Sequence, residues 1–274
     1  MQNKDFYKEF GIRSRVIFSN GRSPASRRRL IQHRMHTTFD ADQMAFVVLR
    51  DDGDYASELR GLGTVKVYES GFPVAFFYTG YSDVTNQENA LFSVAANASL
   101  EILEDLLIDR VISPYMETVD WRAYFDDKLK KPELLLRASL ESQRPVLKLP
   151  NAQALFKSIF YRLASISLEE GYLDEYVERR RGLEERAIEL AEQTLCANPN
   201  IADRARSILE KYNCMDPLNP DITTVTHDID LLINMILVGG YNASVNLPKP
   251  PKRITTPEGI DLNIMEVEFF RPPK

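Results

Sequence analysis

The start of the chain combines a short apolar run with a strongly basic amphipathic stretch. Residues 15–19 have the apolar pattern of a short strand, and a turn signal follows at residues 20–21. Ser23 is a good helix N-cap, and Pro24 loses no hydrogen bond at a first helical position. In a helix, Leu30, Ile31 and Met35 would form only a narrow apolar stripe, because arginines would occupy much of the rest of its circumference. The pattern predicts a basic amphipathic helix over residues 24–36.

Short β-like runs follow this predicted helix. They cover residues 45–50, 63–70 and 72–80. Polar and apolar positions alternate in the second run, and the close connection before the third predicts an antiparallel hairpin whose second strand begins near Val74. Residues 100–112 then have leucines at helical spacing, so we expect a helix that packs on this small sheet.

Helical patterns dominate after about residue 128, and the last predicted helix covers residues 227–238. Four prolines between positions 248 and 257 lack backbone donors, so we expect an extended connector there. Apolar and polar residues alternate again from Ile260 onward. This alternation predicts a terminal strand that returns to the first sheet or adds to a neighbour's sheet.

These patterns together predict an α+β fold. Its expected parts are a small N-terminal antiparallel sheet with two helices, a helical bundle-like half, and an extended C-terminal arm with a terminal strand. A length of 274 residues favours more than one domain. The predicted division is an α+β domain with the basic N-terminal segment over residues 1–128, a helical domain over 129–240, and the Pro-rich arm over 241–274.

Composition places the chain among globular proteins. Hydrophobic residues make up 44% and charged residues 27%, which excludes wholesale disorder. Two cysteines are too few for a disulfide framework, so we expect a reducing compartment. The N-terminus has no apolar run, and no stretch is long and apolar enough to span a bilayer. We therefore expect a protein that is not secreted, makes no membrane contact, and is cytoplasmic or within an intracellularly assembled particle.

Charge is distributed unevenly along the chain. The formal net charge is −6, yet residues 1–39 carry nine Lys or Arg against two carboxylates, which is +7 there and −13 elsewhere. The candidate binding residues are the seven arginines of this segment: Arg13, Arg15, Arg22, Arg27, Arg28, Arg29 and Arg34. Such a cluster binds the phosphates of nucleic acid or an acidic protein surface, in this chain or in another subunit. A merely solvated basic face is the third alternative.

Two histidines of the basic stretch raise the question of a metal site. His33 and His36 are three positions apart, and Asp40 and Asp42 follow them. Imidazole and carboxylate groups at such spacing can hold a divalent cation. The surrounding arginines oppose cation binding, so no metal site is predicted here.

The third histidine precedes an aspartate. The His227-Asp228 pair is similar to the adjacent His-Asp pair of the HD class of metal-dependent phosphohydrolases. That class expects an upstream helical histidine and a downstream aspartate in the same helical core, which this chain does not offer. We therefore interpret Asp228 and Asp230 as acids of a first helical turn, where the helix dipole favours them.

Other catalytic patterns are absent from the sequence. It contains no phosphate-binding glycine loop, no dinucleotide-binding glycine motif and no serine nucleophile elbow. We therefore predict no catalytic residue and no cofactor. The aromatic residues at 72, 76, 77 and 78 are predicted to belong to a core.

The expected function is non-enzymatic. The sequence is typical of a structural or assembly protein, a component of a viral-type or nucleoprotein particle. It would bind partner subunits in a homo- or hetero-oligomer, and nucleic acid as well, through the basic N-terminal surface and the C-terminal arm. The alternative is an accessory subunit of a nucleic-acid enzyme, such as a polymerase or nuclease complex, that contributes template contacts.

Overall fold

The computed structural model describes residues 6–19, 30–33, 37–49, 55–79, 85–112, 114–115, 207–208, 210–212, 214–249 and 252–272. The helices are α1 (Phe6–Glu9), α2 (Tyr55–Glu69), α3 (Asn86–Ile112) and α8 (Ile222–Ile236). The strands are β1 (Val16–Ser19), β2 (Leu30–His33), β3 (Thr37–Asp40), β4 (Ala45–Leu49), β5 (Ala75–Thr79), β6 (Asn242–Asn246), β7 (Arg253–Thr255) and β8 (Asp261–Phe270). Helices and small sheets thus confirm the α+β class.

The first sheet has the strand order β1-β4-β3-β2. β1 pairs with β4 in parallel, whereas β3 is antiparallel to both β4 and β2, so the sheet is mixed and not purely antiparallel as predicted. The predicted helix over residues 24–36 is wrong where it meets the described residues, because β2 lies at Leu30–His33. Pairing with β3 satisfies the β2 backbone, and this tertiary contact overrides the local helical pattern.

α2 replaces the strand predicted at residues 63–70. Its side chains are buried on several sides, because α2 packs on β3 and β4, on α3 and on α1. Leu59, Leu62, Val65 and Tyr68 are all fully buried. A helix enclosed in this way needs no polar face. The apolar residues of α2 therefore do not recur with the helical period of 3.6 residues, and the alternation at residues 63–70 indicated a strand instead.

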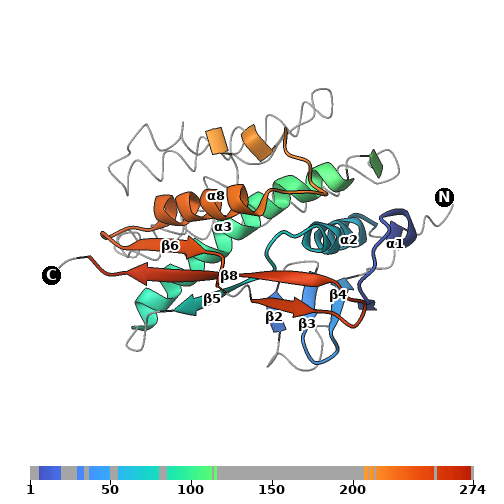
Figure 1. Ribbon diagram of the computed structural model, residues 1–274, viewed down its shortest axis with the longest axis horizontal. Helices are drawn as coiled ribbons and strands as arrows, with labels where there is room; N and C mark the ends of the chain where they lie inside the picture. Colours follow the sequence, from blue (N-terminus) through green and yellow to red (C-terminus); the bar gives the residue numbers. More distant parts are fainter. Residues whose placement is uncertain are drawn as a thin grey trace, which may run out of the picture.

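The second sheet is assembled from distant parts of the chain. Its order is β5-β8-β6, with β7 pairing with another part of β8. The predicted hairpin leading into β5 is wrong, because its first strand is part of α2 and β5 pairs in parallel with β8 instead. β8 confirms the predicted terminal strand, and it lies between β5 and β6 in the middle of this sheet (Figure 1). β6 and β7 lie within the segment that was predicted to be a mostly extended arm.

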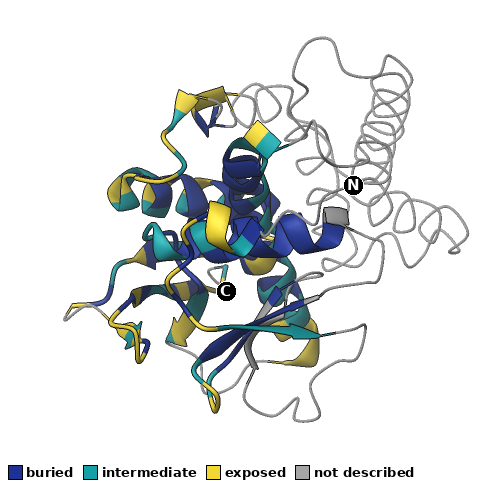
Figure 2. Cartoon of the chain, turned by 90° about the vertical axis from the view of Figure 1, so that its right-hand side faces the viewer, coloured by how far each residue is buried: buried dark blue, intermediate teal, exposed yellow. Residues whose placement is uncertain are grey.

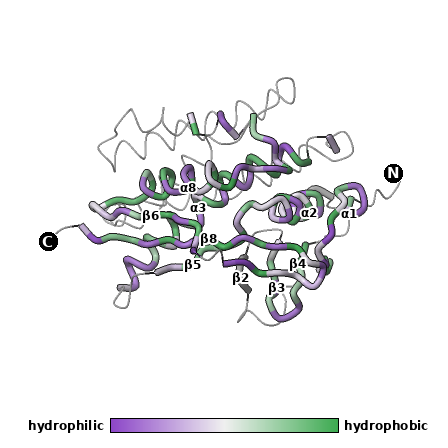
Figure 3. Tube along the Cα trace, in the orientation of Figure 1, coloured by the Kyte–Doolittle hydropathy of each residue, from purple (hydrophilic) through white to green (hydrophobic). Residues whose placement is uncertain are grey.

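α3 and α8 lie side by side over one face of the second sheet (Figure 1). Thr85 and Glu88 form a capping box at the start of α3: the Thr85 N–H donates to Glu88 Oε2 at 2.9 Å, and the Glu88 N–H donates to Thr85 Oγ1 at 3.2 Å. The helix continues for 27 residues, so the predicted helix at residues 100–112 is confirmed as its second half. Hydrophobic residues recur along both helices (Figure 3).

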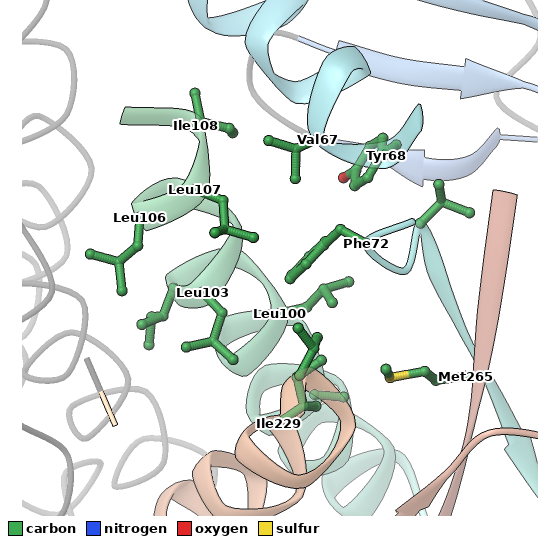
Figure 4. Packing of buried hydrophobic residues seen from close by; sticks show 14 of the residues in the cluster. Val67, Tyr68, Phe72, Leu100, Leu103, Leu106, Leu107, Ile108, Ile229 and Met265 are labelled. Atoms are coloured by element: carbon green, nitrogen blue, oxygen red, sulfur yellow. The ribbon is translucent and has the colours of Figure 1, made fainter. Parts of the chain in front are cut away.

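One hydrophobic core joins these elements. Phe72, just after α2, packs near Leu100 and Leu103 of α3 and near Ile229 of α8 and Met265 of β8 (Figure 4). Buried residues gather where helices face sheets, whereas turns and outer strand positions are exposed (Figure 2). The core therefore includes residues of the predicted N-terminal domain and of the predicted arm. The division at residues 128–129 lies outside the described residues and stays a prediction.

Candidate basic surface at the N-terminal segment

The segment that follows α1 carries the first two candidate arginines, and aromatic packing fixes where it begins. Phe6 and Phe10 contact the ring of Tyr115 edge-on, with centroids 6.2 and 4.7 Å away. Gly11 ends the helix with φ 57°, a left-handed conformation that glycine adopts without strain. Ile12 then enters the core with 7% exposure. The chain therefore leaves α1 in a defined direction.

A carboxylate at the end of α2 holds the next two residues. Glu69 Oε1 accepts hydrogen bonds from the backbone N–H groups of Arg13 at 2.8 Å and Ser14 at 2.6 Å. The Phe46 N–H donates to the Arg15 carbonyl at 2.9 Å and so joins the segment to β4. Hydrogen bonds to an ionised acceptor are stronger than neutral ones. Glu69 and β4 thus fix the backbone on both sides of Ser14.

Two further side chains restrain the same segment. The Tyr7 hydroxyl donates to the Ser14 carbonyl at 3.2 Å, and Lys66 Nζ donates to the Gly11 carbonyl at 3.4 Å. Both donors come from helices, α1 and α2, that pack on each other. Four hydrogen-bonding groups from three elements therefore hold the stretch from Gly11 to Arg15.

This backbone sends alternate side chains in opposite directions. Ser14 is buried with 1% exposure, whereas Arg13 and Arg15 on either side of it are exposed. Within the described residues, neither guanidinium makes an ion pair or hydrogen bond. We refer to these two side chains as the Arg13/Arg15 surface. It presents two permanent positive charges on a fixed backbone.

The other five candidate arginines, Arg22, Arg27, Arg28, Arg29 and Arg34, lie outside the described residues. The structure therefore brings Arg13 and Arg15 together and does not test the rest of the predicted cluster.

Asp40, suspected as a metal ligand, shapes a turn instead. Its Oδ1 accepts from the N–H groups of Asp42 and Gln43, and its Oδ2 accepts from Gln43 Nε2 at 2.9 Å. This pattern closes the connection between β3 and β4. Among the described residues, no group of three or more His, Cys, Asp or Glu side chains could hold a metal ion.

Asp228 and Asp230 are not the first-turn acids that the sequence suggested. α8 begins at Ile222, and Asp221 caps it by accepting from the N–H groups of Thr223 and Thr224. The prediction placed the helix start too late, because the Asp221 cap signal was missed. The two aspartates therefore lie in the interior of the helix.

Asp228 is turned into the core. Its side chain is fully buried and pairs with Lys211 Nζ at 2.8 Å. Burial, followed by the negative charge of Asp228, raises the pKa of the Tyr212 hydroxyl well above its ordinary value. Loss of Lys211 would leave the buried Asp228 carboxylate without its counter-charge, which is costly. The Asp228–Lys211 pair therefore holds α8 against the helical residues before it.

Asp230 has a different partner from Asp228. Asp230 Oδ1 accepts from the Val245 N–H at 2.8 Å and so connects α8 to β6, while burial raises the pKa of this carboxyl. His227 is exposed. His227 lies close enough to Asp230 to favour its charged form, whereas Asp228 is buried against Lys211, so the three residues of the suspected His-Asp motif do not converge on one site.

A second candidate surface carries exposed aromatic side chains that the sequence did not indicate. Phe77 and Tyr78 are 46% and 47% exposed, so the prediction that the aromatic run belongs to a core is wrong for these two residues. Phe270 is exposed as well, at 43%. The strand period of two would have placed Phe77 and Tyr78 on opposite faces, so at least one of them had to point away from the core.

Comparisons with known proteins give no relative: no family model, curated protein or solved structure matches this chain. Of the helices that the structure describes, none combines the length and apolar character needed to cross a bilayer. The arguments that follow therefore rest on the chain's own residues.

Proposed function

We propose that this protein is a non-enzymatic assembly protein whose Arg13/Arg15 surface binds an acidic surface on a partner subunit. The observation that carries the proposal is the fixed display of these arginines: Glu69 holds the backbone N–H groups of Arg13 and Ser14, and both guanidinium groups are left exposed.

A fixed backbone favours binding. Association costs less conformational entropy when the binding residues are already held in position. Arginine is suited to this role because its planar guanidinium can donate two parallel hydrogen bonds to one carboxylate. Two such groups separated by one inward-facing residue can reach two carboxylates on an opposing strand or helix.

The charge of the whole chain favours a protein partner over nucleic acid. The net charge is −6, and residues outside 1–39 carry −13, so a long polyanion would be repelled by most of the molecule. An acidic patch on a protein is local and meets only the basic part. Nucleic acid is the competing partner, and the experiment below separates the two.

The proposal leaves the aspartates of the described residues with structural roles. Asp228 pairs with Lys211, Asp230 accepts from the Val245 N–H, and Asp40 closes a turn. A place in an intracellularly assembled particle, viral-type or nucleoprotein, remains part of the proposal. So does an oligomeric state.

The test uses a labelled glutamate-rich peptide as an acidic protein surface, with single-stranded RNA and duplex DNA of similar charge as competing probes. In fluorescence anisotropy, the Arg13→Gln/Arg15→Gln variant should bind the peptide about tenfold more weakly than the wild type. Lys249→Gln/Arg253→Gln is the control for net charge, because it removes two exposed positive charges elsewhere, one of them the Arg253 that pairs with Asp261. It should bind like the wild type.

Two results would contradict the proposal. One is a folded Arg13→Gln/Arg15→Gln variant that binds every probe as the control does. The other is an effect confined to RNA and DNA, with the salt dependence of phosphate contacts, which would favour the nucleic-acid alternative.

A further inference from the structure

The face of the second sheet that points away from α3 and α8 carries an unusual mixture of side chains. Along β8, Met265, Val267 and Phe269 are buried toward the helices, so the alternate positions point the other way. The Phe269 ring stacks on Phe92 of α3 with centroids 4.2 Å apart, which confirms the inward side. We define the outer sheet face by the side chains opposite: Phe77, Ile264, Glu266, Glu268 and Phe270.

Strand register makes these side chains neighbours. Phe77 of β5 is paired with Glu266, Ser244 of β6 with Glu268, and Asn242 of β6 with Phe270. Phe77 and Phe270 remain 46% and 43% exposed. Two carboxylates therefore lie between two exposed aromatic rings, which is the composition that favours arginine through carboxylate pairing and ring stacking.

The outer sheet face already binds a cation from its own chain. Lys252 Nζ lies 3.4 Å from the centroid of the Phe77 ring. Within the described residues, Glu266 and Glu268 make no ion pair or side-chain hydrogen bond, and Phe270 has no aromatic or cationic partner. The Phe270 side of the face is therefore exposed and acidic, with no counter-charge among these residues.

The Arg13/Arg15 surface of the same molecule is not placed to supply that counter-charge. α1 and the segment after it lie near one end of the long axis, and the end of β8 lies near the other (Figure 1). The two surfaces have opposite charge; Arg13, Arg15, Glu268 and Phe270 are exposed, and Glu266 is half-buried. A second copy can bring its own arginines to this face.

We propose that the protein associates head to tail, with Arg13 and Arg15 of one copy bound to Glu266 and Glu268 beside Phe270 of the next copy. This inference rests on the proposed function and names its partner: a second copy of this chain. The contact joins two different surfaces, so it is heterologous and leaves one free surface at each end of a dimer. Association therefore continues into a chain, or closes into a ring where the rotation allows it.

Charge reversal tests both surfaces together. Arg13→Glu/Arg15→Glu makes both surfaces of the molecule acidic, and Glu266→Lys/Glu268→Lys makes both basic. Each variant alone should be monomeric where the wild type associates, with apparent affinity reduced about tenfold or more. An equimolar mixture of the two should associate again, because every contact between unlike variants pairs an acidic with a basic surface. Sedimentation velocity over a concentration series at low and high salt measures the masses.

Controls separate this contact from a general charge effect. Glu210→Lys/Glu258→Lys makes the same change in net charge at two exposed carboxylates elsewhere and should associate like the wild type. Phe270→Ala keeps all charges and should weaken association without changing its salt dependence. Circular dichroism must show native secondary structure for each variant before its mass is interpreted.

Three outcomes would overturn the inference: a wild type that is monomeric at every concentration, association that survives both reversals, or a mixture that stays monomeric although each reversed variant is folded. If the wild type is monomeric yet still binds the glutamate-rich peptide through Arg13 and Arg15, the head-to-tail contact fails and the proposed function stands. If peptide binding is also independent of these arginines, both fail.

Discussion

Glu88 and Arg271 are 183 positions apart in the chain and form an ion pair, with Arg271 Nε 3.0 Å from Glu88 Oε1. Arg271 Nη2 also donates to Glu88 Oε2 at 3.3 Å, and the Tyr241 hydroxyl donates to Glu88 Oε1 at 3.1 Å. The first turn of α3 is thereby joined to the residue before β6 and to the residue after β8. One carboxylate thus fastens three segments at this end of the second sheet.

The Glu88 carboxylate should make stability depend on acid. Hydrogen bonds from the Thr85 N–H and hydroxyl, with smaller contributions from Tyr241 and Arg271, lower its pKa from 4.5 to about 2. A lowered carboxyl pKa stabilises the fold above pH 4.5, and this contribution is lost as the pH falls toward 2. The difference in free energy of unfolding between the wild type and Glu88→Gln should therefore be largest above pH 4.5 and should shrink as the pH falls toward 2. Urea unfolding at a series of pH values measures it.

Arg271→Leu serves as the comparison for this experiment. Because the hydrogen bonds from Thr85 are the larger cause, this variant should keep most of the acid dependence. If the free energies of unfolding of the wild type and Glu88→Gln differ by the same amount at pH 2 and pH 6, the fold does not hold the Glu88 carboxylate in its ionised form.

Glu69 provides a test of positioning that is separate from charge. Glu69→Ala removes the acceptor that holds the N–H groups of Arg13 and Ser14, while it makes the molecule more positive. Added positive charge alone would strengthen binding to a glutamate-rich peptide. We expect weaker binding together with faster hydrogen exchange at these two amides, because the segment loses its fixed conformation. The control Glu258→Ala changes the charge equally at an exposed position, and tighter peptide binding by Glu69→Ala would refute the role of Glu69.

Removal of residues 247–274 should abolish cooperative folding. The deletion takes away β7 and β8, and β8 supplies the pairing partner of both β5 and β6. It also removes the fully buried side chains of Leu262, Met265 and Val267, and a single large core truncation already costs about 2–5 kcal/mol. Thermal melting followed by circular dichroism should show no native transition. Deletion of residues 271–274 alone retains the sheet and should melt cooperatively; a native melting temperature in the longer deletion would disprove the central role of β8.

Gly63 allows α2 to approach α3 closely. A Cβ atom at this position would lie 2.8 Å from Ile112 Cγ2 and 3.1 Å from Ile108 Cγ2. Overpacking of a core costs about 1–3 kcal/mol, which outweighs the gain of up to about 1 kcal/mol in helix propensity. Gly63→Ala should therefore lower the free energy of unfolding, as measured in urea.

Two companion variants complete the Gly63 experiment. Ile112→Leu removes the Cγ2 branch and should recover part of the loss in a double-mutant cycle. Asn97→Ala, at an exposed position of α3, should leave stability nearly unchanged or raise it slightly. A more stable Gly63→Ala protein would mean that the two helices are not in close contact there.

Some elements could be predicted because their local signals agree with their tertiary surroundings. β8 alternates between buried and outward positions, as its sequence does, and α8 has a strong apolar stripe that faces the core. The failures have physical causes as well. α2 has no polar face to reveal its period, and β2 is held by pairing with β3 against the local helical pattern. The parallel partner of β5 lies too far along the chain for any local pattern to indicate it.

The candidate surfaces also divide into local features, which the sequence reveals, and long-range features, which it does not. The arginines could be identified from the sequence, because charge needs no tertiary information. Their fixed display was not, since Glu69 lies 56 positions beyond Arg13. Asp228 shows the opposite case: its adjacent histidine suggested chemistry, while the burial that pairs it with Lys211 is a property of the fold.

The place of β8 in the middle of its sheet has a consequence for how the protein is made. The Asn263 side chain donates to the Gly71 carbonyl across 192 positions, and among the described strands β5 pairs only with β8. During synthesis on the ribosome, β5 and the apolar surface of α3 emerge long before the residues that will cover them. Long-range pairing of this kind is slow to form and exposes unpaired edges meanwhile. We expect the nascent chain to depend on chaperones until β8 has emerged and paired with β5 and β6.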